Sequence, residues 1–148
     1  MVFLLIVMLQ KKTKYAIKAL VALTRVYKSK TLLSISSISN TEKIPRKFLE
    51  KILLELKSQG FLGSKMGMNG GYFLIKNPKD IMLSTIIRST GGPIALSPCV
   101  SINFYAPCEE CEDEATCILK DTLLQVRVAS VKILSNTSLL QLAKEKKL

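Results

Sequence analysis

Four cysteines gather in the second half of the chain, in a segment that also carries prolines and many carboxylates. They are Cys99, Cys108, Cys111 and Cys117, with eight, two and five residues between them. Thiolates are soft ligands that suit zinc and iron–sulfur clusters, and a Cys-x-x-Cys pair can place two sulfurs on one metal. The segment therefore predicts a metal site or an iron–sulfur site of the 2Fe–2S or 4Fe–4S type, with zinc as the alternative ion.

A thiol redox switch, and cysteines with no ligand role, are two other interpretations of the same segment. Carboxylates close to a thiol disfavour its ionised form unless a metal offsets their charge, which counts against a simple low-pKa redox cysteine. The sequence shows no secretory signal, so we expect a reducing cytoplasm, where structural disulfides are rare. The surrounding carboxylates are Glu109, Glu110, Glu112, Asp113 and Glu114.

Catalysis is not expected. The chain has no histidine, so it offers no Ser-His or Cys-His pair, and no phosphate-binding GxxxxGK loop occurs. An enzyme would need cysteine or carboxylate chemistry without a base of suitable pKa. We therefore predict a binding protein.

The positive charge is confined to one half of the chain. The formal net charge is +11; residues 8–80 hold 15 Lys/Arg and 4 Asp/Glu, whereas residues 81–148 hold 7 of each. Such an excess suggests a polyanionic partner, with an evenly solvated basic surface as the alternative. The first half is thus the candidate nucleic-acid-binding unit.

Helical periodicity organises that first half. Apolar residues recur at helical spacing over residues 13–27, a short second helix is expected over residues 34–40, and Pro45 suits the first turn of a third helix that ends near Gly60. Arg46, Lys47 and Lys51 lie off the apolar stripe of this third helix. Three helices with a tight turn before a basic third helix describe a helix-turn-helix.

Two short β-prone runs follow, over residues 61–65 and 71–75, joined by the glycine-rich turn MGMNG. A hairpin directly after the third helix predicts a wing that lies beside the DNA backbone or minor groove. The expected fold is therefore mainly α with a small β wing: a winged helix-turn-helix, then a cysteine loop and a long helix.

The second half is expected to begin with a short helix over residues 83–89. Residues 118–135 then form a long helix with more apolar surface than a lone helix leaves in water. We expect one face on its own domain and one on a second copy, since a dimer also spaces two recognition helices. Burial wholly within its own chain is the alternative. Asn136 is expected to cap a last short helix.

The domain boundaries follow from these elements. Residues 8–80 are expected to form the DNA-binding domain, and residues 81–148 the sensor loop (97–117) and dimerisation helix (118–135). Residues 1–7 are interpreted as a non-native upstream extension, with Met8 the natural start. The apolar run MVFLLIVML is too short to span a bilayer, so we expect no membrane partner; a weak membrane-surface anchor is the alternative.

Several motifs together resemble the Rrf2 family of bacterial winged-helix regulators: KKTKYAIKALVAL, PRKFLEKILLELKSQGFLGSK, NGGYFL and the cysteine cluster. The resemblance covers about residues 8–143. It implies a homodimer on a near-palindromic double-stranded operator, each chain giving one recognition helix and one wing. The DNA-binding positions it implies are Lys14 and Tyr15 on the first helix, Pro45, Arg46, Lys47, Phe48 and Lys51 on the third, and Ser64, Lys65, Gly70, Gly71 and Tyr72 on the wing.

Two departures from the family pattern matter. Met66 stands where family wings often carry an arginine that enters the minor groove, so base recognition is expected to rest on Arg46, Lys47 and Lys51. Lys120 stands where iron–sulfur members carry a histidine ligand, so the fourth ligand is expected to be a cysteine or an acidic oxygen; Cys99 is favoured beside Cys108, Cys111 and Cys117. The cluster need not survive purification. The alternative function is a metal or iron–sulfur protein whose basic half binds nucleic acid non-specifically.

Overall fold

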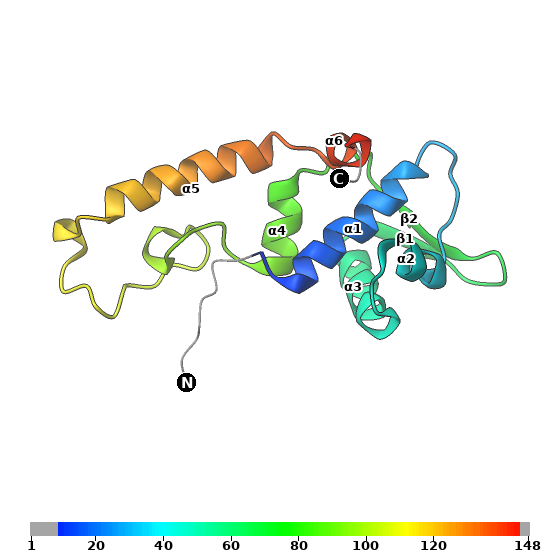
Figure 1. The fold of residues 1–148 in the computed structure, drawn as a ribbon, viewed down its shortest axis with the longest axis horizontal. Coiled ribbons are helices and arrows are strands. Elements are labelled where there is room, and N and C mark those ends of the chain that lie inside the picture. Colours follow the sequence, from blue (N-terminus) through cyan, green and yellow to red (C-terminus); the bar gives the residue numbers. More distant parts are fainter. Residues whose placement is uncertain (1–8, 146–148) are drawn as a thin grey trace.

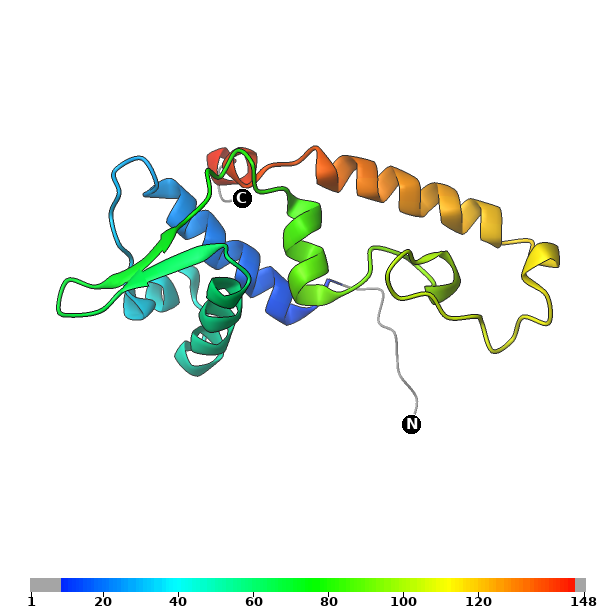
Figure 2. The ribbon, with the colours of Figure 1, turned by 180° about the vertical axis from the view of Figure 1, so that it is seen from behind.

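A computed structural model describes residues 9–145. The first four helices, the hairpin and the last helix form a packed head, and the helix of residues 120–135 projects from it as an arm (Figures 1 and 2). The N-terminal segment interpreted as an extension lies outside these residues. The helices are α1 (Lys11–Arg25), α2 (Ile35–Glu42), α3 (Arg46–Ser58), α4 (Leu83–Gly91), α5 (Lys120–Ser135) and α6 (Leu139–Lys144), and two 3₁₀ turns are η1 (Pro98–Val100) and η2 (Glu114–Thr116). The expectation of a mainly α fold with a small β wing is confirmed.

The head is built on the apolar stripes of α1, α2 and α3. Leu20 and Leu23 on α1 meet Leu53 and Leu56 on α3 in one core, where each is at most 1% exposed. Ser34 caps α2, because its hydroxyl accepts a hydrogen bond from the Ser37 backbone N–H at 3.1 Å. Burial of these stripes fixes the angle at which α3 leaves the core, and leaves its opposite face outside.

The wing is an antiparallel hairpin of β1 (Leu62–Lys65) and β2 (Gly71–Leu74). Leu33 adds a bridge that the sequence did not indicate: its N–H donates to the Tyr72 carbonyl at 3.1 Å and its carbonyl accepts from Tyr72 at 2.9 Å. Gly71 permits this approach, since a Cβ there would lie 2.7 Å from the Leu33 carbonyl oxygen. The base of the wing is therefore held by the loop before α2.

The C-terminal helix returns to the head. Leu139 on α6 is fully buried in the core, and α6 packs against α1. Ser138 caps α6, and its backbone N–H donates to the Gln141 side chain at 2.6 Å, completing a capping box. The prediction that Asn136 caps this helix is wrong: Asn136 ends α5, and its amide donates to the Lys132 carbonyl.

Helix α5 forms the arm and lies beside α4 and η1, away from the wing (Figures 1 and 2). It begins two residues later than expected, and none of its 16 residues is buried. Its inner face is only half-buried, so burial wholly within its own chain is wrong for this helix. Within residues 9–145 no helix is long and apolar enough to cross a membrane.

Candidate nucleic-acid interface and cysteine loop

The N-terminal turns of α3 present the basic residues that the sequence singled out. Arg46, Lys47 and Lys51 are all exposed. Arg46 Nε donates to Glu50 Oε1 at 3.4 Å, one helical turn away, with 63% of the arginine side chain exposed. Because an exposed pair of this kind is worth at most about 1 kcal/mol, Arg46 can exchange Glu50 for another acceptor at little cost.

Two aromatic residues join α1 to the start of α3. The rings of Tyr15 and Phe48 meet edge to face, with centroids 5.7 Å apart, and Lys11 Nζ lies 5.7 Å from the Tyr15 centroid. Phe48 is 39% exposed, so part of its surface remains available. Both residues thus have a scaffold role, whereas Lys14 is exposed and Pro45 directly precedes α3.

The predicted wing residues also divide into exposed residues and residues that hold the structure together. Lys65 is exposed at the end of β1, while Ser64 accepts a hydrogen bond from Lys57 Nζ at 2.6 Å. Gly70 lies where a Cβ would collide with the Lys65 carbonyl, and Tyr72 is half-buried. Gly70, Gly71 and Tyr72 are therefore accounted for by the backbone of the hairpin and its packing, and Lys65 is the exposed residue among the predicted wing positions.

Two methionines occupy the tip of the wing. Met66 is 96% and Met68 102% exposed, more than the other large apolar side chains of the head. Such apolar tips can wedge against base steps in the minor groove. In the sequence, Met66 stood out only as a missing arginine and Met68 did not stand out; the repeat Met-x-Met within a glycine-rich turn was the available signal.

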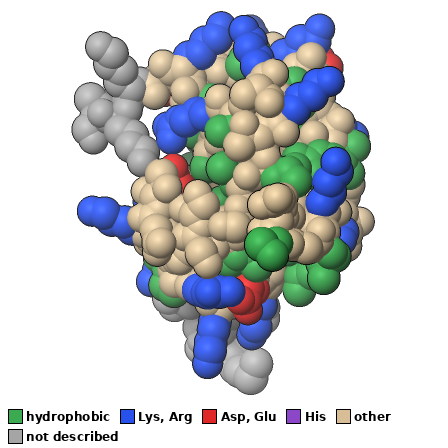
Figure 3. All heavy atoms as spheres, turned by 90° about the vertical axis from the view of Figure 1, so that its right-hand side faces the viewer, with side chains coloured by type: hydrophobic (Ala, Val, Ile, Leu, Met, Phe, Trp, Pro, Cys, Tyr) green, Lys and Arg blue, Asp and Glu red, His purple; other side chains and the backbone are tan. Residues whose placement is uncertain are grey.

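The end of the head that carries the wing is basic. Lys and Arg side chains spread over this face in Figure 3, and Asp and Glu are few. This distribution agrees with the excess of 15 basic over 4 acidic residues in residues 8–80. Displacing counterions from DNA phosphates would give this surface a strongly salt-dependent affinity for duplex DNA.

The structure brings the four cysteines together as two pairs. Ser97 Oγ lies 3.3 Å from Cys99 Sγ and 3.5 Å from Cys108 Sγ. Cys111 and Cys117 form the second pair. Burial, followed by the charge of Cys117 and a hydrogen bond with it, raises the pKa of Cys111 above its ordinary value. All four thiols are free and half-buried.

A polar network lies beside these pairs. Glu114 accepts hydrogen bonds from Lys120 Nζ at 2.7 Å and from the Tyr105 hydroxyl. The bond from Lys120, and then that from Tyr105, lowers the pKa of Glu114; the same contacts raise the pKa of Lys120 and of Tyr105. Lys120 is thus held as an ammonium ion, which has no lone pair for a metal. The sequence did not indicate this network.

The donor set suits an iron–sulfur cluster in its chemistry, because four soft thiols lie in one loop of the chain. The positions of the thiols do not yet form a complete ligand set. Among residues 9–145, no three His, Cys, Asp or Glu side chains are grouped closely enough to hold a metal ion. The two thiol pairs would have to approach each other for all four sulfurs to serve one site.

Comparison with known proteins gives consistent results. The family of Rrf2 proteins, described as iron-dependent transcriptional regulators, matches residues 9–145. An rrf2-like HTH-type transcriptional regulator of Rhodobacter capsulatus is 40% identical over 121 residues, 80% of this chain and 81% of the relative. The HTH-type transcriptional regulator NsrR of Geobacillus kaustophilus is 28% identical over 134 residues, 90% of this chain and 88% of the relative.

Solved structures show the same fold. The global cysteine regulator CymR of B. subtilis superposes with a TM-score of 0.77 at 25% identity, covering 95% of this chain and 98% of the other. IscR of T. potens superposes with a TM-score of 0.70 at 20% identity, covering 95% and 93%.

Proposed function

The chain belongs to the Rrf2 family of DNA-binding transcriptional regulators, which are not enzymes, and from this premise we propose that it is a sequence-specific, homodimeric regulator whose operator affinity is set at its cysteine loop. The observation that carries DNA reading is the start of α3, where Arg46, Lys47 and Lys51 are exposed while the opposite face of the helix is buried. A helix so placed can enter a major groove, with the wing alongside.

Base selection is assigned to Arg46 and Lys47, which can donate to the O6 and N7 acceptors of guanine. Lys51, one turn after Lys47 on α3, is assigned to the same base-reading face, and phosphate contacts are assigned to Lys14 and Lys65. The Tyr15–Phe48 contact fixes α1 against α3, so that Lys14 and Arg46 approach the duplex from one rigid unit.

The test is fluorescence anisotropy with an operator selected from random duplexes. Arg46→Ala should weaken binding by about 1–3 kcal/mol and relax the preference at one base pair. Lys132→Ala, on the exposed side of α5, removes the same charge and should leave affinity unchanged. If no sequence is enriched in the selection, the protein is a non-specific binder, and the alternative of a metal protein with a basic half replaces this proposal.

The homodimer is supported by the outer face of α5. Leu119, Val126 and Ile133 recur every seven residues and are 59%, 38% and 66% exposed. Thr122 and Ala129, both exposed, fill the intervening positions. Spacing of three and four residues is the pattern of a helix that packs against another helix, and a second copy supplies the same stripe by symmetry.

The regulatory role is assigned to the loop of residues 97–117. Cys108, Cys111 and Cys117 would hold an iron–sulfur cluster, with Cys99 as the fourth ligand because Lys120 is bound to Glu114. When bound, the cluster supplies reversible one-electron chemistry. The loop runs directly into α5, so a change in the spacing of its thiols would move the start of that helix and, with it, the separation of the two recognition helices.

A thiol switch is the second candidate, favoured by the arrangement of the thiols as two pairs. Two thiols and one hydrogen peroxide would give one disulfide and two water molecules, the peroxide taking up the two electrons. Cys99 and Cys108, which both lie beside Ser97, and Cys111 and Cys117, which share a hydrogen bond, are the candidate pairs.

Anaerobic purification with iron, sulfide and zinc analysis separates the two candidates. Cluster binding predicts iron and sulfide in equal amounts and visible absorption, both lost in Cys111→Ala, whereas Met68→Ala should retain them. A metal-free protein that loses two thiols per disulfide on peroxide treatment would support the switch. Equal operator affinity of the two states would overturn regulation through this loop in either form.

A further inference from the structure

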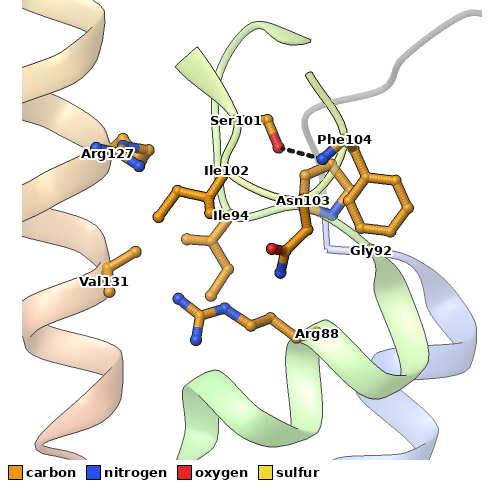
Figure 4. Close-up of a pocket in the computed structure, with 10 residues that line it drawn as sticks. Arg88, Gly92, Ile94, Ser101, Ile102, Asn103, Phe104, Arg127 and Val131 are labelled. Carbon is orange, nitrogen blue, oxygen red and sulfur yellow. Dashed lines mark hydrogen bonds between the residues drawn. The ribbon is translucent and has the colours of Figure 1, made fainter. Parts of the chain in front are cut away.

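A small pocket lies between α4, the segment after it and α5, apart from the wing and the start of α3. It is lined by Arg88, Gly92, Pro93, Ile94, Ser101, Ile102, Asn103, Phe104, Arg127 and Val131. Figure 4 shows Arg127 and Val131 on α5 facing Arg88 on α4 across Ile94, Ile102 and Asn103. We propose that this pocket binds the anionic head group of a small carboxylate or phosphate compound, and that the bound anion joins the arm to the head.

The first argument is charge. Two guanidinium groups line the pocket and no acidic residue does. Arg127 Nε is buried and has no hydrogen-bond partner, and neither Arg88 nor Arg127 forms an ion pair within residues 9–145. Because burying a charged donor without a hydrogen-bond partner is unfavourable, an acceptor placed at this position would stabilise the folded protein.

The second argument is the remaining lining. Ser101 Oγ accepts a hydrogen bond from the Phe104 N–H at 3.1 Å, which leaves its own proton free to donate. Asn103 adds a second neutral polar group. Guanidinium, hydroxyl and amide donors together match an oxyanion, since arginine forks bind carboxylate and phosphate with paired hydrogen bonds.

Size restricts the ligand. The hollow holds about 290 Å³ of space, part of it open to solvent, so it suits a small charged group better than a whole large compound. The apolar lining residues Ile94, Ile102 and Val131 would contact the body of a larger compound whose anionic group is held by the arginines. The two arginines are therefore expected to bind the negative group of a ligand, and the apolar side chains to contact the rest of it.

The position gives such binding a consequence. Arg88 belongs to the head and Arg127 to the arm, and residues 101–104 follow Cys99 after one residue. An anion held by both arginines would oppose their mutual repulsion and fix α5 against α4. Arm, head and cysteine segment would then respond to one ligand.

Binding is tested on the full chain by isothermal titration with inorganic phosphate, and separately with acetate, at constant ionic strength and without DNA. Wild type should bind one anion per chain with saturation; the anion that binds more tightly identifies the head group. Arg127→Gln and Arg88→Gln should each weaken binding by about tenfold or more, and Arg127→Lys by less than Arg127→Gln. Lys132→Gln, five residues after Arg127 on the exposed side of α5, is the matched control and should change binding by less than about twofold.

Three outcomes would overturn the proposal. They are no saturable binding of either anion, equal weakening by Lys132→Gln and Arg127→Gln, or dissociation of a dimer by Arg127→Gln with anion binding unchanged. The last result would mean that a carboxylate of a second copy satisfies Arg127. Arg88→Gln changes an exposed side chain and keeps the test valid if Arg127 variants fold poorly. Because no DNA is present, failure here leaves the proposed operator binding untouched.

Discussion

The head and the arm of this molecule differ in how much of their apolar surface they bury. In the head, α1 and α3 place residues such as Leu20, Leu49 and Leu53 in a core where none is exposed. In the arm, none of the 16 residues of α5 is buried, and Ile133 is 66% exposed. The head is complete as a single chain, while the arm has the surface of a component that needs a second element.

That difference separates two kinds of function. A rigid head holds Arg46 and Lys65 at fixed positions, which suits a part that must match the spacing of DNA grooves. A weakly packed arm opens or shifts at a lower free-energy cost than the core of the head. Ligands and partners can therefore change its position more readily. Recognition is therefore expected in the head, and response in the arm.

The largest effect is expected from truncating the core of the head. Leu53→Ala removes a fully buried side chain and should lower the free energy of unfolding by about 2–5 kcal/mol. Urea unfolding followed by circular dichroism measures the loss. Leu54→Ala is the matched control, because Leu54 is 61% exposed on the same helix and should change stability by no more than about 0.5 kcal/mol.

Leu119→Ala extends this comparison to the arm. Its effect should depend on protein concentration, because a residue that contributes through a second copy stabilises only the associated state. A large loss that is the same at every concentration would mean that the arm folds against its own head, contrary to the expected dimer.

A charge on the outer stripe of α5 is expected to give the next largest effect. Val126→Glu would bury an unpaired carboxylate between two copies and so weaken dimerisation by about a hundredfold, which corresponds to about 2.7 kcal/mol. Light scattering after size exclusion gives the mass. Val128→Glu is the control: Val128 is 55% exposed but off the stripe. Monomers from both variants, or from neither, would contradict the assigned face.

The smallest effect is expected at the wing. Lys65→Ala should weaken operator binding uniformly across sequences and make the slope of log affinity against log salt shallower by about one. Anisotropy titrations over a range of salt concentrations measure it. Met66→Ala should leave the slope unchanged, and a lower affinity only at flexible pyrimidine–purine steps would identify an apolar wedge. An unchanged slope in Lys65→Ala would remove that residue from the interface.

Most elements of the head could be predicted because their signals are local. Apolar spacing located α1 and α3, and Asn69-Gly70 located the turn of the wing. The pairing of Leu33 with Tyr72 could not be predicted, since it joins backbone groups far apart in sequence through the space left by Gly71. Asn136 was wrongly assigned as a cap because Ser138, with Gln141 three residues later, forms the stronger capping pair.

The candidate sites followed the same division. Residue type alone identified Arg46 and Lys47 as candidate base contacts and the four cysteines as soft donors. Sequence could not show that Phe48 packs on Tyr15, that Ser64 is bound by Lys57, or that two of the four thiols lie beside Ser97. Such contacts depend on the angles between elements, which no local spacing encodes.

By itself, the sequence determined a basic winged helix-turn-helix followed by a cysteine loop and an apolar helix, because charge placement, helical period and turn residues act over a few neighbours. Only the tertiary structure decided that α5 leaves its apolar stripe uncovered, that Lys120 is held by Glu114, and that Arg88 and Arg127 share a pocket in which no described residue pairs with them. The physical reason is burial: whether a side chain is satisfied or left without a partner depends on what the distant parts of the chain bring beside it.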